Sequence, residues 1–360
     1  MPPVRVLIVD DSVVVRKLLS EAVASCPQLQ LAGTASSGAI ALARIPQLNP
    51  DVITLDIEMP GLNGIETLVE IRRLYPKLPV IMFSTLSERG AAITLEALSL
   101  GASDYLTKPT NSASLADAMQ QVRCELIEKI LSLSRLQTAA MPAPRLAAVA
   151  RTRTCAQPIE VLAIGTSTGG PSALAEVIPR LPGDFPVPVL IVQHMPPLFT
   201  RLLADRLNSQ SQLEVQEAED GRRLEAGQVW IARGDCHLTV TRKGAGAAIS
   251  LNQEPPENSC RPAVDVLFRS VARVYGARAL GVVMTGMGSD GARGAAYIRE
   301  AGGEVLAQDE ASSVVWGMPG AVVHAGVADK VCALAEISGE IIRRVAAGRV
   351  LAGSAAAMKS

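Results

Sequence analysis

The sequence lacks the features of a membrane protein. None of its apolar runs approaches the roughly 18 consecutive residues that a spanning helix needs. The chain opens with MPPVRVLIVDD, which passes directly into an expected strand that carries acidic residues, so we expect no signal peptide either. These two absences predict a cytoplasmic protein without direct membrane insertion.

Paired cysteines and a basic surplus are also missing. The six cysteines lie far apart and none forms a C-x-x-C pair, which argues against a zinc site and a disulfide framework. Net charge is −1. Residues 1–125 contain 10 basic and 13 acidic residues, residues 126–158 contain 5 basic and 1 acidic, and residues 159–345 contain 17 basic and 21 acidic. We therefore expect no nucleic-acid partner, because the concentrated basic face of such binders is absent.

What the chain does contain is typical of a globular protein with two or three domains, since its 360 residues are 48% hydrophobic and 19% charged. The pattern predicts a first α/β domain over 1–125 and a second over 159–345. Between them, residues 126–158 read as a linker containing prolines, alanines and arginines, although 126–137 could prolong the last helix of the first domain. Residues 346–360 are expected to form a flexible tail.

The first domain alternates five apolar strand runs with five amphipathic helical segments, which predicts a parallel sheet covered on both faces. Chemistry-bearing residues follow these strands, and in such sheets they gather at the carboxyl edge. They are Asp10 and Asp11 after the first strand, Asp56 after the third, Ser84 after the fourth and Lys108 after the fifth. Three converging carboxylates predict a Mg²⁺ site with a lysine placed to pair with a phosphate.

This segment resembles the response-regulator receiver domain over essentially all of residues 1–125. The motifs that carry the resemblance are Asp10-Asp11, Asp56 with Met59-Pro60-Gly61, Ser84, and Thr107-Lys108-Pro109. The resemblance implies a flavodoxin-like (βα)₅ fold in which Asp56 accepts a phosphoryl group from a histidine kinase.

The same resemblance assigns the supporting residues of the receiver. It implies that Asp10, Asp11, Asp56 and the carbonyl of Glu58 hold Mg²⁺, and that Lys108 and Ser84 read the phosphate. Tyr105 matches the aromatic switch position, although a half-buried strand tyrosine is an equally fair interpretation. A phosphoaspartate adds charge and acceptor oxygens, so the first domain is interpreted as a switch.

The second domain opens with a strand at 161–164, the turn Gly165-Thr166-Ser167-Thr168-Gly169-Gly170, and a helix begun by Pro171. The turn fits Gly-x-Ser-x-Gly, in which glycines allow a sharp turn to expose a serine hydroxyl. A phosphate-cradling loop with Ser167 as a helix N-cap fits this motif about equally well. Further apolar runs predict a doubly wound, mostly parallel sheet with a β-rich insertion between about 213 and 251.

Only three histidines are available as a catalytic base. His194 follows an apolar strand, whereas His237 and His324 lie in segments that favour structural roles. Asp290 follows a third strand, so Ser167, His194 and Asp290 are predicted to meet at one sheet edge. There histidine would take the serine proton while aspartate orients it, and the N–H of Met287 would serve as an oxyanion donor.

The turn that contains Asp290 permits another interpretation. Residues Gly286 to Gly291 fit G-x-G-x-x-G, which would indicate a dinucleotide site with Asp309 as the ribose acid. This alternative is disfavoured because that fingerprint normally opens its domain. The chain order Ser, His, Asp also differs from that of ordinary α/β-hydrolases.

Both domains together resemble the chemotaxis protein-glutamate methylesterase (CheB) family. The motifs are Ile164 to Gly170, Gln193-His194-Met195-Pro196 and Met284 to Gly291, with Thr166 and Ser289 as mild departures beside the catalytic positions. The resemblance implies hydrolysis of glutamyl γ-methyl esters on the cytoplasmic helices of chemoreceptors, releasing methanol, with deamidation of receptor glutamines as a second activity.

The family mechanism implies backbone oxyanion donors near Thr168 and Met287 and no metal for the esterase. It also implies that the unphosphorylated receiver covers the esterase site until Asp56 is phosphorylated. A non-enzymatic adaptor, in which a receiver is joined to a receptor-binding module, is the main alternative. All three catalytic positions are present, which favours the enzyme.

Overall fold

The computed structural model describes residues 2–108, 115–138, 157–244 and 246–357. It divides into two compact units, Met1–Pro142 and Ala143–Ser360, and each is treated by itself below. The division falls inside the segment expected as a linker. Most of that segment, residues 139–156, lies outside the described residues.

The first unit is a five-stranded parallel sheet with the strand order β2-β1-β3-β4-β5. The strands are β1 (Val4–Val9), β2 (Leu29–Ala35), β3 (Val52–Asp56), β4 (Val80–Ser84) and β5 (Asp104–Thr107). Every residue of β3 and β4 is buried, as expected for central strands covered on both faces. The predicted receiver fold is confirmed.

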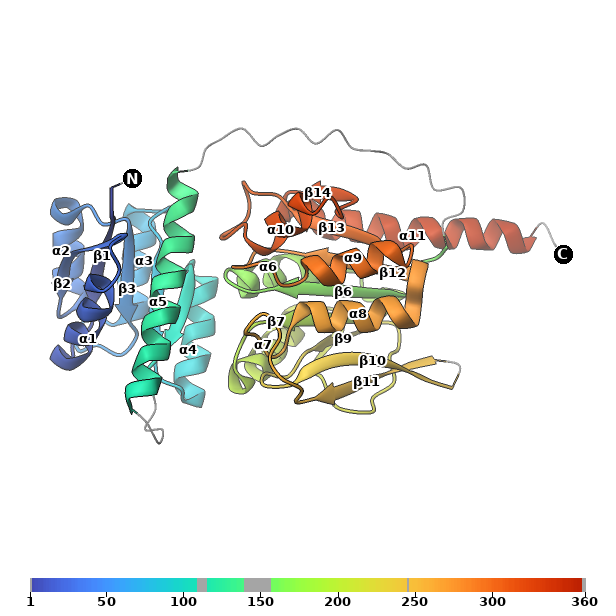
Figure 1. The fold of residues 1–360 in the computed structure, drawn as a ribbon, viewed down its shortest axis with the longest axis horizontal. Coiled ribbons are helices and arrows are strands. Elements are labelled where there is room, and N and C mark those ends of the chain that lie inside the picture. Colours follow the sequence, from blue (N-terminus) through green and yellow to red (C-terminus); the bar gives the residue numbers. More distant parts are fainter. Residues whose placement is uncertain (1, 109–114, 139–156, 245, 358–360) are drawn as a thin grey trace. The chain divides into compact units, whose positions relative to one another are not determined.

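Five helices cover this sheet. They are α1 (Val13–Ala24), α2 (Gly38–Leu48), α3 (Gly64–Leu74), α4 (Glu88–Ser99) and α5 (Leu115–Thr138). Helices α1 and α5 pack together on one face, and α2, α3 and α4 lie on the other (Figure 1). Side chains of Ser12, Ser37, Asn63 and Ser87 cap the first four, which fixes where each helix begins.

The second unit is built on a seven-stranded sheet with the order β14-β13-β12-β6-β7-β9-β8, and all its strand pairs are parallel. The strands are β6 (Val161–Thr166), β7 (Val189–Gln193), β8 (Glu214–Glu217), β9 (Gln228–Ile231), β12 (Ala279–Val283), β13 (Glu304–Gln308) and β14 (Lys330–Cys332). The three strands that precede the predicted catalytic residues, β12, β6 and β7, are adjacent at the centre.

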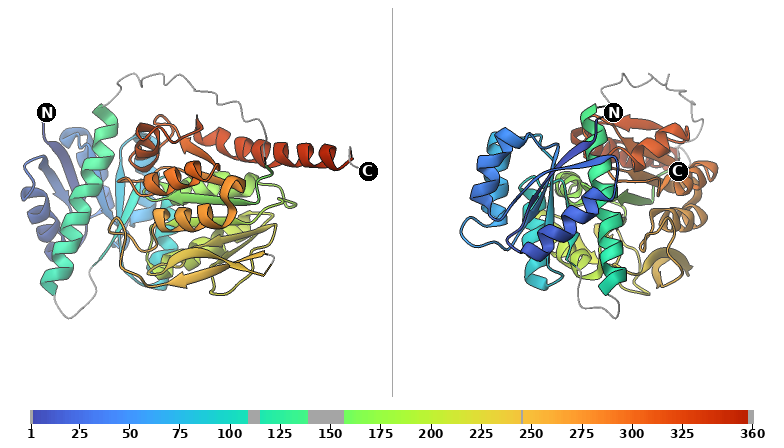
Figure 2. Two further views of the ribbon diagram at one scale, coloured as in Figure 1. Left: turned by 45° about the vertical axis from the view of Figure 1, so that its right-hand side comes forward. Right: turned by 60° about the vertical axis from the view of Figure 1, so that its left-hand side comes forward.

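Helices flank this second sheet on both sides (Figure 2). Contacts join α8 (Val264–Tyr275), α9 (Ala292–Glu300) and α10 (Met318–His324) in one layer, and α6 (Gly170–Val177), α7 (Pro197–Gln210) and α11 (Leu334–Ala357) in another. Short 3-10 helices follow α6 at Ile178–Arg180 and α8 at Gly276–Arg278. The fold matches the predicted doubly wound α/β class.

Two expectations about the extent of these elements need correction, and a third is confirmed. The β-rich insertion is smaller than predicted, because β8 and β9 extend the main parallel sheet and only β10 (His237–Lys243) and β11 (Gly246–Asn252) form a separate antiparallel hairpin. Helix α5 continues to Thr138, which confirms that 126–137 prolong the last helix of the first domain. Helix α11 continues to Ala357, through most of the segment expected as a flexible tail.

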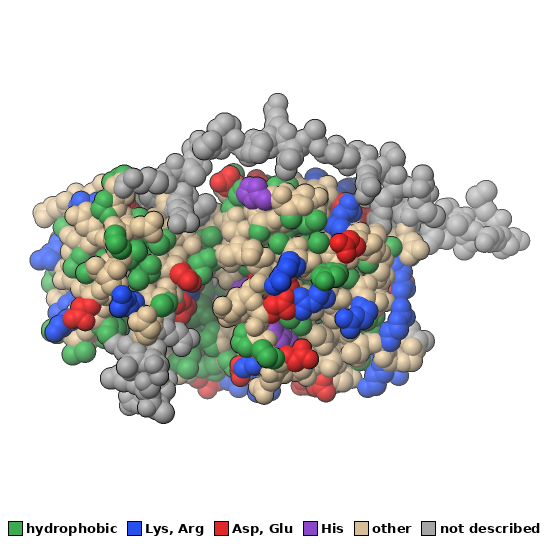
Figure 3. Space-filling view, in the orientation of Figure 1, with side chains coloured by type: hydrophobic (Ala, Val, Ile, Leu, Met, Phe, Trp, Pro, Cys, Tyr) green, Lys and Arg blue, Asp and Glu red, His purple; other side chains and the backbone are tan. Residues whose placement is uncertain are grey.

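The surface agrees with the charge pattern of the sequence. On the face in Figure 3, the described Lys and Arg side chains lie interspersed with Asp and Glu on the second unit. Within the described part of the chain, no helix combines the length and the apolar character that membrane crossing requires.

Candidate functional site

Ser167 lies in the turn between β6 and α6, where the sequence placed it. Its backbone N–H donates to the carbonyl of Thr285 at 3.0 Å, and its own carbonyl accepts from the Gln193 side chain at 2.9 Å. Gly169, which precedes α6, has a φ of +76°, and a Cβ there would come within 2.6 Å of Val314. The turn therefore requires glycine and holds the half-buried Ser167 against the ends of β7 and β12.

His194 follows β7 directly, next to the strand that delivers Ser167. Its Nε2 lies 2.8 Å from Oδ2 of Asp290, and 13% of its side chain is exposed. Burial by itself would lower the pKa of His194, but hydrogen bonds with Asp290 and Cys260 outweigh it and raise the pKa to about 10. The structure thus brings together the predicted base and the predicted orienting acid.

Asp290 is almost fully buried, with 1% of its surface exposed, and its carboxylate is saturated with donors. Besides His194, it accepts from the backbone N–H groups of Val264 at 2.7 Å, Asp265 at 3.0 Å and Gly291 at 3.0 Å. Burial would raise the pKa of Asp290, but these hydrogen bonds and His194 hold it below its usual value. Asp290 is therefore an ionised acceptor.

The predicted oxyanion positions lie in two neighbouring turns. Thr168 is buried, and its carbonyl accepts from the Thr285 hydroxyl at 2.9 Å. Met287 is half-buried in the turn after β12, and the residue before it, Gly286, bridges to Trp316. Hydrogen bonds of Thr285 thus connect the two turns whose N–H groups were expected to stabilise the oxyanion.

The other two histidines have contacts that suit structural roles. The ring of His237 accepts from the N–H of Ala263 at 3.2 Å and lies 3.2 Å from the carbonyl of Pro255. His324 packs edge-on against Trp316 with ring centroids 5.5 Å apart. Neither contact uses a group expected in the catalytic constellation.

The dinucleotide alternative finds little support at the residues it needs. Asp309, its expected ribose acid, accepts from the N–H of Ser312 at 3.0 Å and so closes its own loop. Asp290, inside the Gly-rich turn, is committed to His194 and to the start of α8. Both carboxylates are thus used within the protein.

Three residues that the sequence did not indicate lie beside His194 and Asp290. Cys260 Sγ lies 3.5 Å from Nδ1 of His194, and the Asn258 side chain donates to Asp290 at 2.8 Å and to Asp265 at 3.0 Å. Asp265 is buried at the start of α8 and accepts from the N–H of Gly294 at 2.6 Å. No local pattern marks these residues, because they reach the site only through the tertiary fold.

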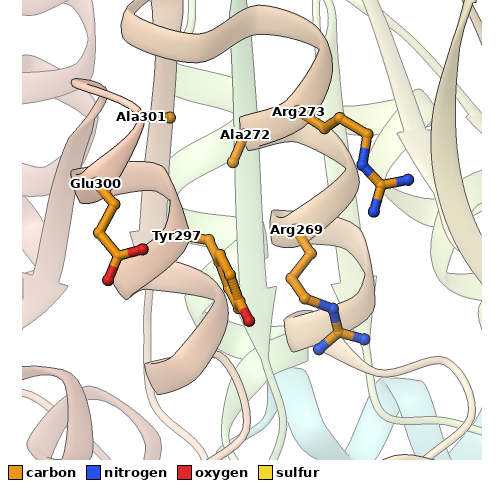
Figure 4. A pocket seen from close by; sticks show the side chains of 6 residues that line it. All are labelled: Arg269, Ala272, Arg273, Tyr297, Glu300 and Ala301. Carbon is orange, nitrogen blue, oxygen red and sulfur yellow. The ribbon is translucent and has the colours of Figure 1, made fainter.

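A shallow groove of about 380 Å³ lies between α8 and α9. Figure 4 shows the side chains that line it: Arg269, Ala272, Arg273, Tyr297, Glu300 and Ala301. None of the predicted catalytic residues is among them, so this groove is separate from the predicted catalytic constellation.

In the first unit, the predicted metal-binding carboxylates converge. Oxygen atoms of Asp10, Asp11 and Asp56 lie within 4.8 Å of one another, and Lys108 Nζ lies 2.8 Å from Asp56 and 3.7 Å from Asp10. Among the described residues, Asp10 Oδ2 and Asp56 Oδ2 are buried without a hydrogen-bond donor. Buried oxygens that no donor serves suit a hard cation such as Mg²⁺. Glu58 donates its N–H to Asp56 at 3.4 Å, which places its backbone beside this cluster.

Burial raises the pKa of two carboxyl groups in this cluster. Burial, followed by repulsion from Asp56, raises the pKa of Asp10 to about 6. Burial likewise raises the pKa of Asp56, against the opposing effect of Lys108. A divalent cation would favour the ionised form of both groups.

The predicted switch residues face other partners in this structure. The Ser84 hydroxyl accepts from Thr94 at 2.7 Å and donates to the carbonyl of Gly90 at 3.2 Å, so it is directed toward α4. Tyr105 is buried, and Lys129 of α5 donates to its carbonyl at 2.6 Å and lies 5.0 Å from its ring centroid. Reading a phosphate would require Ser84 to exchange these partners.

Known proteins match both units. Residues 162–341 match the family model described as CheB methylesterase, and residues 6–120 match that of the response regulator receiver domain. A protein-glutamate methylesterase/protein-glutamine glutaminase of Trichodesmium erythraeum is 50% identical over 96% of this chain and 100% of its own length. One from a Nocardioides species is 52% identical over 97% of both chains. The crystal structure of the Thermotoga maritima CheB methylesterase catalytic domain matches with a TM-score of 0.51 and 43% identity, covering 51% of this chain and 98% of that one.

Proposed function

The chain belongs to the CheB methylesterase family and carries a response regulator receiver domain, and on that premise we propose that it hydrolyses glutamyl γ-methyl esters of chemoreceptors. Water and the ester give glutamate and methanol. Deamidation of receptor glutamines is proposed as a second activity, since the same acyl transfer with ammonia as the leaving group gives glutamate. The substrate lies on the cytoplasmic helices of the receptor, so we propose that the protein acts in the cytoplasm.

In the proposed mechanism, Ser167 attacks the γ-carbonyl while His194 removes the hydroxyl proton. Asp290 orients the imidazole and stabilises its protonated form. The single observation that carries this assignment is the placement of Ser167 and His194 at the ends of the paired strands β6 and β7, with Asp290 bonded to the His194 ring. Water then cleaves the acyl-enzyme, with His194 again acting as the base.

The developing oxyanion is proposed to lie against backbone N–H groups of Thr168 and Met287. Thr168 precedes α6 by two residues, so the positive end of that helix dipole also favours an anion there. Donors fixed in place before the reaction stabilise the transition state without reorganising.

Control of the esterase is proposed to come from the receiver. A histidine kinase phosphorylates Asp56. Asp10, Asp11, Asp56 and the Glu58 carbonyl would hold the Mg²⁺, which would neutralise charge on the phosphoryl group. The phosphate draws Lys108 and Ser84 toward it, Tyr105 follows, and the receiver releases the esterase site. The orphaned oxygens of Asp10 and Asp56 support the metal assignment, and the Lys108 ion pair supports the phosphate assignment.

Methanol release from a methylated chemoreceptor tests the proposal. The wild type, Ser167→Ala and Asp56→Ala are compared with and without a small-molecule phosphodonor and Mg²⁺, with Ser209→Ala, an exposed serine on α7, as the matched control. We expect stimulation of the wild type and of Ser209→Ala, basal activity in Asp56→Ala, and none in Ser167→Ala.

Full activity of Ser167→Ala would reject the proposed nucleophile. A wild type that binds receptor but releases no methanol would favour the adaptor. Deleting residues 1–150 is expected to raise the basal rate, because a tethered inhibitor acts at high effective concentration. A less active truncated protein would contradict the inhibitory role of the receiver.

A further inference from the structure

A four-residue turn, Glu257 to Cys260, lies against the catalytic pair. The N–H of Glu257 donates to the carbonyl of Cys260 at 3.1 Å, and the N–H of Cys260 donates back at 2.9 Å. Asn258 and Ser259 have φ values of 53° and 61°, so both central residues are left-handed, as in a type I′ turn. This arrangement fixes the direction in which the Cys260 side chain leaves the turn.

Side-chain hydrogen bonds connect this turn to α8 and to Asp290. Arg269 holds the Glu257 carboxylate with two hydrogen bonds of 2.7 and 2.6 Å, and Figure 4 shows that Arg269 projects from α8. Asn258 donates to both Asp290 and Asp265, at 2.8 and 3.0 Å. The position of the Cys260 thiol is therefore set by the same network that holds the catalytic aspartate.

The hydrogen bonds of His194 identify the nitrogen that must act as the base. Oδ2 of Asp290 is ionised and can only accept, so Nε2 of His194 must carry the proton that joins them. In the neutral ring, Nδ1 is then the nitrogen with the lone pair for the Ser167 proton. In this structure Nδ1 faces Cys260 Sγ at 3.5 Å, and within the described chain His194 forms no hydrogen bond with the Ser167 hydroxyl.

We propose that Cys260 is a positioning residue for the base, whose thiol occupies Nδ1 of His194 and so restrains the imidazole until Ser167 displaces it. This inference rests on the proposed function and adds a residue to it. Nδ1 cannot bond to the Cys260 sulfur and to the serine hydroxyl at the same time. The thiol and the nucleophile therefore compete for the same nitrogen.

Charged groups around His194 and Cys260 are Asp290 from the turn after β12, Asp265 from α8, Glu257 from the turn itself, and Arg269 and Arg293, which pair with Glu257. Cys260 is the group in direct contact with Nδ1.

The first test is the pH dependence of kcat/KM for methanol release by the full chain. In Cys260→Ala, the imidazolium loses a stabilising partner, so the acid limb should move to lower pH by about one unit. Cys236→Ala, which removes another half-buried thiol of the same domain, should leave the limb in place. A role in folding alone would scale activity at every pH, so an unmoved limb in Cys260→Ala overturns the proposal.

The second test does not depend on esterase activity. Iodoacetamide labelling of each thiol is followed by mass spectrometry in the wild type and in His194→Gln, whose amide can still bond to Asp290. Because Cys260 Sγ lies 3.5 Å from the His194 ring, the rate of Cys260 labelling at pH 6.5 should differ between the two proteins, with that of Cys236 unchanged.

Equal labelling of Cys260 in both proteins would show that the pair does not interact. A wild type without esterase activity in which Cys260 labelling still depends on His194 would reject the proposed function and leave the Cys260 contact standing. The two failures are thus distinguishable.

Discussion

Asp290 and His194 stand 96 residues apart in the sequence, and Oδ2 of Asp290 lies 2.8 Å from Nε2 of His194. The same Oδ2 accepts from the N–H of Val264, at the beginning of α8. Helix α8 has no cap from its own preceding residue Ala263, so Asp290 fulfils that role from a distant segment. Orientation of the base is thereby coupled to the folding of α8.

Asp290→Asn should reduce kcat by about 10²–10⁴-fold, because an amide no longer enforces the tautomer in which Nδ1 is the base. Asp290→Ala should in addition lower the thermal stability, since the N–H groups of Val264, Asp265 and Gly291 lose their acceptor at about 1–3 kcal/mol each. Methanol release and thermal unfolding measure the two effects. Asp205→Asn, on the exposed side of α7, is the control and should change neither. Wild-type turnover in Asp290→Asn would contradict the orienting role.

Mg²⁺ binding to the receiver should depend on pH through Asp10. Because its pKa is raised from 3.8 to about 6, the folded protein without metal holds the Asp10 proton more tightly than the unfolded chain does. Its contribution to stability is complete below pH 3.8 and is lost as pH rises through about 6. Mg²⁺ requires the ionised form, so its affinity should fall by about tenfold per pH unit below that pKa.

Titration calorimetry with Mg²⁺ on the full chain tests this expectation. Asp10→Asn should bind more weakly and lose most of the dependence between pH 5 and 7, whereas Glu96→Gln on the exposed side of α4 should behave like the wild type. A wild-type affinity that is flat across this range would show that Asp10 does not release a proton on binding.

The proposed catalytic residues could be placed together from the sequence because two of them directly follow strands. Ser167 and His194 end apolar runs that are visible in the sequence, and parallel strands bring such ends to one edge. Asn258 and Cys260 could not be found in this way. Their contribution depends on a turn and on hydrogen bonds to segments distant in the chain, for which no periodic pattern exists.

The predicted extents of the β-rich insertion and of the C-terminal tail were wrong for physical reasons. Strand β8 is four residues long with the polar sequence EVQE, and its parallel pairing with β9 is a tertiary contact that its residues do not encode. The segment after Ala346 is rich in alanine, which has high helix propensity, and α11 continues through it to Ala357.

Ser259→Gly should stabilise the second unit. A left-handed conformation costs a side-chain-bearing residue about 1–2 kcal/mol, and the extra freedom of glycine in the unfolded chain offsets about 0.5–1 kcal/mol of that gain. The expected net gain is about 0.5–1 kcal/mol, measured by thermal or urea unfolding. The comparison is Ser209→Gly, which lies near the end of helix α7. It should lower the free energy of unfolding, because glycine is a poor helix former. Destabilisation by Ser259→Gly would indicate that the serine side chain has a role beyond the turn.

Gly286→Ala should disable the nucleophile without unfolding the protein. A Cβ at Gly286 would lie 2.9 Å from Cβ of Ser167 and 2.3 Å from Sδ of Met318, so one of these neighbours must move. A displacement of about 1 Å in a reacting group lowers the rate by about 10²-fold, while overpacking costs about 1–3 kcal/mol.

The matched change is Gly339→Ala, on the exposed side of α11, where an added Cβ meets no atom within 4 Å. It should keep the wild-type rate and raise stability by up to about 1 kcal/mol, because alanine is the better helix former. If Gly286→Ala retained wild-type turnover while Met318 alone shifted, the flexible thioether would have absorbed the added methyl group. The position of Ser167 would then be set by β6 and by its own turn, independently of the turn after β12.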